Sequence, residues 1–211
     1  MPAFKNLTVV EHPVVARDLT TLRDKSTPSA AFRPALNRIA TILAYHALNH
    51  LPLRTVSVET PITTAVGHVI DTQLVVVPIL RAGLGMVDAI TQFIPDVKIG
   101  HLGIYRDKTT HKPVDYYANL PKGLDSSVVL LVDPMLATGG SATDAIQYLK
   151  NAGATHIRFI TLIAAPEGVG AVLDAHPDVT IITAALDERL NDHAYIVPGL
   201  GDAGDRIFGT E

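Results

Sequence analysis

Short apolar runs and amphipathic segments alternate along the chain from residue 73 onward. The runs predict strands buried on both faces, and they lie at residues 73–80, 98–105, 127–132, 157–164 and 180–185. The segments between them predict helices at residues 86–93, 142–151 and 167–175. This alternation is typical of an α/β fold with a mostly parallel, twisted sheet flanked by helices.

The first fifty residues have a helical pattern instead. One apolar stripe with spacings of three and four residues consists of Leu36, Ile39, Ala40, Leu43, Ala44, Ala47 and Leu51. We expect Pro34 in or before the first turn of this helix, because a proline deeper inside removes a hydrogen bond and clashes with the preceding turn. Residues 54–70 alternate valine, threonine and small side chains, which favours a strand or a hairpin.

The composition narrows the class of protein. The chain has 211 residues, 47% of them hydrophobic, and a net charge of -4 from 17 Lys+Arg and 21 Asp+Glu. This length predicts one domain over residues 1–211, and the charge provides no cationic field for nucleic acid or anionic lipid. No apolar run approaches the roughly 18 residues of a membrane span, and the N-terminus lacks the apolar core of a signal peptide. We therefore expect a soluble, cytoplasmic protein that binds neither nucleic acid nor a membrane.

The loop that follows the run at residues 127–132 has the composition of a phosphate site. Its sequence is Asp133-Pro134-Met135-Leu136-Ala137-Thr138-Gly139-Gly140-Ser141. Small residues let backbone N–H groups converge on an anion, two hydroxyls add donors, and the helix that starts next contributes its positive end. Asp133 is a poor neighbour for a bare phosphate, but its carboxylate can accept hydrogen bonds from the hydroxyls of an attached sugar. The loop therefore predicts a site for a sugar phosphate.

Other interpretations of this loop fit less well. A tight turn capped by Ser141 is the simplest one, but the position between a buried strand and a helix, with an acid at the strand end, favours a ligand site. A P-loop kinase would need the Gly-Lys-Ser/Thr ending whose lysine reaches the outer phosphates. A dinucleotide site would need Gly-x-Gly-x-x-Gly, and the loop contains neither motif.

Two arginines follow other runs at the same predicted edge of the sheet. Arg81 comes directly after residues 73–80, and the alanine and glycines that follow it let the backbone approach a ligand closely. An arginine beside open amides suits a diphosphate, which has more oxygens than one side chain can bind. Arg106 follows residues 98–105 and precedes a polar excursion at residues 107–121, whose length indicates a functional loop.

Three segments together resemble one family. They are VLLVDPMLATGGS at residues 129–141, VPILRAGLGM at residues 77–86 and YIVPGLGDAGDRIFGT at residues 195–210. The first is similar to the 5-phosphoribosyl-1-pyrophosphate (PRPP) loop of type I phosphoribosyltransferases, and the proline after its acid is typical of their uracil branch. Weaker similarity extends from residue 11 to the end, so the likeness to uracil phosphoribosyltransferases covers nearly the whole chain.

The resemblance implies a fold and a reaction. The expected fold is phosphoribosyltransferase-like, with an N-terminal helical segment, a protruding arm at residues 107–121 and a C-terminal hood over the base. The expected reaction, in pyrimidine salvage, transfers phosphoribosyl from PRPP to uracil and yields UMP and pyrophosphate. Mg²⁺ would bind mainly through PRPP or pyrophosphate, without a set of protein ligands, and the chain would form a homodimer or homotetramer. Some relatives are activated by GTP, and no motif here decides whether GTP is an effector.

The resemblance also assigns roles to residues. PRPP would be bound by Arg81, Arg106, Asp133, Pro134, Met135, Leu136, Ala137, Thr138, Gly139, Gly140, Ser141 and Asp202. Uracil would be read by the main chains of Ile196, Gly201 and Ala203, together with Asp202. The catalytic set would be Asp133, Arg81, Arg106 and Asp202, of which Asp202 is the acid nearest to the N1 proton of uracil. The hood at residues 195–210 is too rich in glycine for a regular element, so we expect tight turns there.

Interpretations from other classes remain. A regulator of pyrimidine metabolism built on the same fold would bind RNA through a basic face, which scattered lysines and arginines on a chain of net charge -4 do not provide. A nucleoside or nucleotide kinase is disfavoured by the missing loop lysine. The histidines do not predict a metal site, since His46 and His50 have the spacing of a zinc helix but lack its glutamate.

Overall fold

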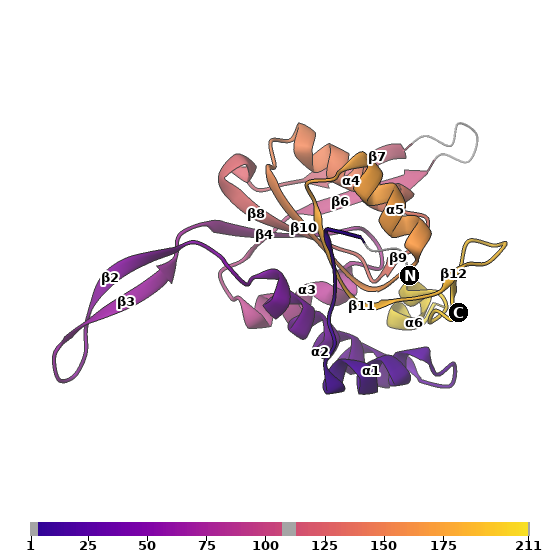
Figure 1. Cartoon of the computed structure of the whole chain (residues 1–211), viewed down its shortest axis with the longest axis horizontal. Helices are drawn as coiled ribbons and strands as arrows, with labels where there is room; N and C mark the ends of the chain where they lie inside the picture. The colour runs from indigo at the N-terminus through magenta and orange to yellow at the C-terminus, as the bar shows by residue number, and fades with distance from the viewer. Residues whose placement is uncertain (1–3, 107–112, 211) are drawn as a thin grey trace.

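The computed structural model describes residues 4–106 and 113–210. Its centre is a seven-stranded sheet in the order β1-β11-β10-β8-β4-β5, with β9 beside β10, and its pairings are parallel (Figure 1). The strands are β1 (Leu7–Val9), β4 (Gln73–Pro78), β5 (Lys98–Ile99), β8 (Ser127–Val132), β9 (Met135–Leu136), β10 (His156–Ala164) and β11 (Thr180–Leu186). The predicted parallel α/β sheet is confirmed, although the apolar pattern does not reveal the short β1.

Helices cover both faces of the sheet (Figure 1). They are α1 (Pro13–Arg23), α2 (Ser29–Ala47), α3 (Leu84–Phe93), α4 (Gly140–Asn151), α5 (Pro166–Ala175) and α6 (Ala203–Phe208). Along β8, Val128, Leu130 and Val132 pack with α1, α2 and α3, whereas Val129 and Leu131 pack with α4 and α5. Burial on both faces explains why β8 is apolar at every position after Ser127. Within the described ranges, none of the helices combines the length and hydropathy of a bilayer-spanning segment.

Three antiparallel pairs lie outside this sheet. The strands β2 (Leu53–Glu59) and β3 (Thr64–Ile70) form a hairpin that projects from the body of the molecule, so of the two alternatives predicted for residues 54–70 the hairpin is confirmed (Figure 1). The other pairs are β6 (His101–Arg106) with β7 (Pro113–Asn119), and β12 (Arg189–Leu190) with β13 (Ile196–Val197). A short 3-10 helix, η1 (Leu124–Ser126), leads into β8.

Pro34 lies in the second turn of α2, so the prediction that it sits in or before the first turn was wrong. The helix begins at Ser29, well before the apolar stripe, because Phe32 and Ala35 are also fully buried against the core. Proline has no N–H to donate to the carbonyl of Ala30. The helix continues through this position because its buried face outweighs one missing hydrogen bond.

Two further predictions need correction. Residues 98–105 do not form one buried strand, because β5 is an exposed edge of the sheet and the chain beyond it leaves to form β6. The C-terminal segment does contain a regular element, α6. The carboxylate of Asp202 accepts a hydrogen bond from the N–H of Asp205 at 3.0 Å and caps this helix. Gly209 ends the helix with a φ of 68°.

Candidate active site

The carboxyl ends of β4 and β8 bring two predicted site residues to one edge of the sheet. The strands are neighbours, with Pro78 opposite Val132, and the N–H of Ile79 donates to the carbonyl of Val132 at 2.9 Å. The turn that carries Arg81 therefore begins beside Asp133, which follows β8 directly. Ligands of parallel α/β sheets bind at this edge.

Residues 133–141 connect β8 to α4, as the sequence predicts. The connection includes β9, which pairs with β10, and α4 begins at Gly140. Gly139 is the N-cap residue, with a φ of +83°, and Ser141 lies within the helix, so the alternative of a turn capped by Ser141 was wrong. Among the described residues no side chain caps the first amides of α4. With the helix dipole, these amides offer an anion a set of hydrogen bonds.

Gly168 in the first turn of α5 supports this loop from behind. A Cβ at Gly168 would lie 2.3 Å from the carbonyl oxygen of Ala137 and 2.9 Å from that of Leu136. The backbones of α5 and the loop are therefore in direct contact, and glycine is the residue that permits such an approach. Our sequence reasoning missed Gly168, although a glycine inside an amphipathic helical pattern is a signal of close packing.

Asp133 lies partly buried at the end of β8. Burial raises the pKa of its carboxyl to about 7, the N–H of Met135 at 3.5 Å lowers it, and the negative charge of Asp202 raises it. Near neutral pH the protonated form of the Asp133 carboxyl is therefore far more favoured than in an exposed aspartate. Asp202, the cap of α6, is therefore close enough to the end of β8 for its charge to act on Asp133.

Arg81 joins the turn after β4 to α6. Its Nη2 lies 3.0 Å from Oδ1 of Asp205, and its guanidinium lies 5.7 Å from the ring centre of Phe208. Hydrogen bonds from the hydroxyl of Thr210 and from Arg81 hold the pKa of Asp205 below its usual range. More than half of the Arg81 side chain is exposed, so its remaining N–H groups are accessible to a ligand. Nothing local in the sequence links Arg81 to Asp205, and our sequence reasoning missed Asp205.

A cavity of about 420 Å³ lies against the C-terminal segment. Gly201 and Asp202 contribute to its lining, together with Arg23 and the loop between α1 and α2. Ile196 and Ala203 are buried and do not line this cavity. The structure thus brings two of the predicted base-reading residues to a cavity, and the reading of a base by the main chains of the others stays a prediction.

Arg106 ends β6, where its backbone pairs with Pro113 of β7. The strand stays next to the candidate site because the N–H of Leu80 donates to the carbonyl of Leu102 at 3.3 Å. Residues 107–112 of the predicted arm lie outside the described residues. The role of Arg106 toward PRPP therefore stays a prediction.

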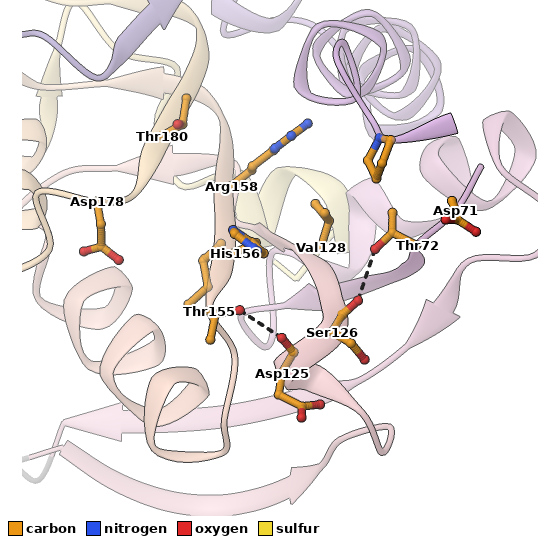
Figure 2. Close-up of a pocket in the computed structure, with 12 residues that line it drawn as sticks. Asp71, Thr72, Asp125, Ser126, Val128, Thr155, His156, Arg158, Asp178 and Thr180 are labelled. Carbon is orange, nitrogen blue, oxygen red and sulfur yellow. Dashed lines mark hydrogen bonds between the residues drawn. The ribbon is translucent and has the colours of Figure 1, made fainter. Parts of the chain in front are cut away.

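A second cavity, of about 430 Å³, lies at the opposite edge of the sheet (Figure 2). It is lined by Val128, His156 and Thr180, which lie at or near the amino ends of β8, β10 and β11. The connections around it are joined by a hydrogen bond of 3.0 Å from the hydroxyl of Thr155 to the carbonyl of Asp125. Because ligands of parallel sheets bind at the carboxyl edge, this cavity is not the candidate site.

The chain shares its fold with solved structures. One protein from Aquifex aeolicus has a TM-score of 0.91 at 35% identity, with 97% of this chain and 99% of that chain covered. Adenine phosphoribosyl transferase from Trypanosoma brucei has a TM-score of 0.60 at 12% identity, over 93% of this chain and 88% of its own, which is a likeness of fold alone. The fold, with its uncapped loop after β8, is that of the phosphoribosyltransferases.

The sequence specifies the family further. The model of the family described as uracil phosphoribosyltransferase matches residues 9–210. Uracil phosphoribosyltransferase from Oceanobacillus iheyensis is 53% identical over 98% of this chain and 99% of its own. The protein of that name from Geobacillus kaustophilus is 56% identical over 96% of this chain and 98% of its own. The chain belongs to the uracil phosphoribosyltransferase family, which confirms the resemblance stated above.

Proposed function

We propose that this protein transfers the 5-phosphoribosyl group of PRPP to N1 of uracil, giving UMP and pyrophosphate. The observation that carries the proposal is the pairing of uncapped amides at the start of α4 with the carboxyl of Asp133 at the same edge of the sheet. Amides suit the phosphate of the donor, and a carboxylate suits the hydroxyls of its ribose. Membership in the uracil phosphoribosyltransferase family supports the same activity.

The donor would be held at three points. Main-chain amides and hydroxyls of residues 137–141 would bind the 5-phosphate, which does not react, so its binding energy can orient the ribose. Asp133 would accept hydrogen bonds from the ribose hydroxyls. Arg81 and Arg106 would bind the diphosphate, whose negative charge grows as the anomeric C–O bond breaks. No side-chain nucleophile is required, because N1 of uracil attacks the anomeric carbon.

The base would be read by the segment around α6. Uracil presents a fixed row of acceptor, donor and acceptor, which main-chain groups of Ile196, Gly201 and Ala203 can match without a charged side chain. N1 must lose its proton during the transfer. Asp202 is our candidate for receiving it, since its charge acts on Asp133 within the same site.

Mg²⁺ is the cofactor that we propose for the reaction. The described residues contain no group of three or more His, Cys, Asp or Glu side chains arranged to hold a metal ion. The acids available at the site are Asp133 and Asp202, and one or two carboxylates plus substrate phosphates is an arrangement that suits Mg²⁺. When bound, the ion would neutralise negative charge on the departing diphosphate.

An assay with a panel of bases tests the proposed function. We expect PRPP and uracil to give a product with the mass of UMP, with release of one pyrophosphate per product. Cytosine, hypoxanthine and orotate should give less than about one hundredth of that rate, because a site that hydrogen-bonds one base leaves groups unpaired with another. GTP added to the same assay tests it as an effector. Absence of any PRPP consumption, together with salt-dependent RNA binding, would support the regulator instead.

We also propose that the protein is a homodimer joined through the β2–β3 hairpin. The hairpin pairs with no other strand of the described chain, and isolated two-stranded hairpins are marginally stable in water. Ile62 is 94% exposed and Val66 is 74% exposed on it. Its strands carry only Arg54 and Glu59 as charged residues, one near each end, so a second copy can pack against it without facing like charges.

Replacing both Ile62 and Val66 with lysine tests this interface. We expect sedimentation at micromolar concentration to give a dimer for the unaltered protein and a monomer for the variant, because like charges would meet across the two-fold axis. Tyr195→Ser, which removes an exposed aromatic side chain elsewhere, is the matched control and should leave the mass unchanged. A monomer for the unaltered protein contradicts the proposal.

A further inference from the structure

An ion pair fastens the end of α1 to the segment after β11. Nη1 of Arg23 donates to Oδ2 of Asp187 at 2.9 Å, and Nη2 donates to Oδ1 at 2.6 Å. The side chain of Asp187 is 4% exposed and that of Arg23 is 26% exposed. Two parallel hydrogen bonds between a guanidinium and a carboxylate fix both groups in one orientation. The pair is therefore a rigid attachment point between segments that are far apart in the sequence.

The same two side chains hold the peptide groups of Gly199. Its N–H donates to Oδ2 of Asp187 at 2.9 Å, and its carbonyl accepts from Nη1 of Arg23 at 2.8 Å. Gly199 has a φ of +65°, and a Cβ there would lie 2.2 Å from the carbonyl oxygen of Ile196. Glycine thus allows the turn to close directly onto Ile196. The Ile196 carbonyl is therefore packed directly against the backbone of Gly199.

The next residue of the turn is held as well. The carbonyl of Leu200 accepts a hydrogen bond from Nη1 of Arg206 at 2.7 Å, and the same guanidinium lies 4.5 Å from the ring centre of Phe32. Polar groups at positions 199 and 200 are therefore used to shape the turn. Gly201 follows them, and its N–H donates no hydrogen bond to any residue within 4–106 and 113–210.

We propose that Arg23 and Asp187 are positioning residues for base recognition, an inference that rests on the proposed function. They would hold the turn at Gly199 so that the main chains of Ile196 and Gly201 meet the lactam edge of uracil. A base read by backbone groups needs those groups fixed in advance, because each must lie within hydrogen-bond reach at the same moment. Apart from Asp202, the proposed PRPP site is built from other segments, at the ends of β4, β6 and β8. Loss of the ion pair should therefore weaken the binding of uracil and leave the binding of PRPP unchanged.

Steady-state kinetics of Asp187→Asn and Arg23→Lys test this proposal. Asparagine cannot accept both the Gly199 N–H and the paired guanidinium bonds, and lysine keeps the charge of Arg23 without its fork. In each variant we expect the KM for uracil to rise at least about tenfold, while the KM for PRPP stays within about twofold. Lysine at position 23 should have the smaller effect, since it retains one donor.

Asp18→Asn is the matched control. Asp18 is also a buried acid in a two-point contact with an arginine, since Arg38 donates to it at 2.7 and 3.0 Å. That pair joins α1 to α2, so its loss should lower the melting temperature without changing the KM for uracil. If Asp18→Asn raises this KM as much as Asp187→Asn does, the effect is general destabilisation and the proposal is overturned.

Other outcomes separate this inference from the proposed function. A folded Asp187→Asn protein with an unchanged KM for uracil overturns the positioning role alone, provided that the unaltered enzyme makes UMP. If the unaltered enzyme makes no UMP from PRPP and uracil, the proposed function itself fails. Should Asp187→Asn fail to fold, as judged by circular dichroism, Arg23→Lys decides the question, and an unchanged KM for uracil in that variant overturns the positioning role.

Discussion

Asp133→Asn should lower the rate of UMP formation from PRPP and uracil at least about tenfold while making the free protein more stable at pH 8. The amide cannot provide the charged acceptor that the ribose hydroxyls require, and a hydrogen bond to a charged group is stronger than one to a neutral group. Because the change removes an interaction with the reacting sugar, we expect kcat to fall as well as kcat/KM for PRPP.

The stability of the folded protein should change in the opposite direction. Burial raises the pKa of the Asp133 carboxyl from 3.8 to about 7, so between these values the folded state binds more protons than the unfolded state. The free energy of unfolding of the unaltered protein therefore falls as the pH rises from about 4 to about 7. The Asp133→Asn variant lacks this pH dependence. Its free energy of unfolding should exceed that of the unaltered protein by about 1–3 kcal/mol at pH 8, and the difference should become smaller toward pH 5.

Urea unfolding at pH 5 and pH 8, combined with product assays, measures both effects. Asp96→Asn is the control, because Asp96 is an exposed acid on the connection between α3 and β5, and it should change neither rate nor stability. An Asp133→Asn enzyme with unaltered turnover would remove Asp133 from the ribose site. We expect the stability gained by Asp133→Asn over the unaltered protein to be larger at pH 8 than at pH 5. A smaller gain at pH 8 would show that burial does not destabilise the ionised carboxyl.

Much of the fold could be predicted because the buried positions of strands and helices are apolar and recur at regular spacings in the sequence. β8 occupies residues 127–132 as predicted, since both of its faces are covered and every position after Ser127 is apolar. The phosphate loop could be predicted equally well, because the end of β8, residues 133–141 and the start of α4 are consecutive in the sequence. Asp133 could be assigned to the strand end for the same reason.

Contacts between distant segments could not be predicted in this way. Arg23 meets Asp187 across 164 positions, and Arg81 meets Asp205 across 124, so no local spacing records either pair. The same limitation explains why Pro34 was misplaced. Its helix begins at Ser29 because residues before the predicted apolar stripe also pack against the core. The stripe alone therefore placed the start of the helix too late.

Gly168→Ala should reduce kcat/KM for PRPP by about a hundredfold, because it displaces the backbone that binds the 5-phosphate. The new methyl group would lie 2.3 Å from the carbonyl oxygen of Ala137, and neither partner is a flexible side chain. The loop must therefore be displaced by roughly 1 Å to relieve this contact. A displacement of about 1 Å can lower a rate about a hundredfold when the reaction depends on orientation. Fluorescence or calorimetric titration with PRPP would show the same loss in binding.

Gly170→Ala provides a control within the same helix. A Cβ at Gly170 would have no atom within 4 Å, so the substitution adds helix propensity without touching the loop. We expect it to stabilise the protein by about 0.5–1 kcal/mol and to leave kcat/KM for PRPP unchanged. If Gly168→Ala instead binds PRPP as tightly as the unaltered protein does, then residues 137–141 do not hold the 5-phosphate. Equal losses in both variants would place the effect in α5 as a whole and not in its contact with Ala137.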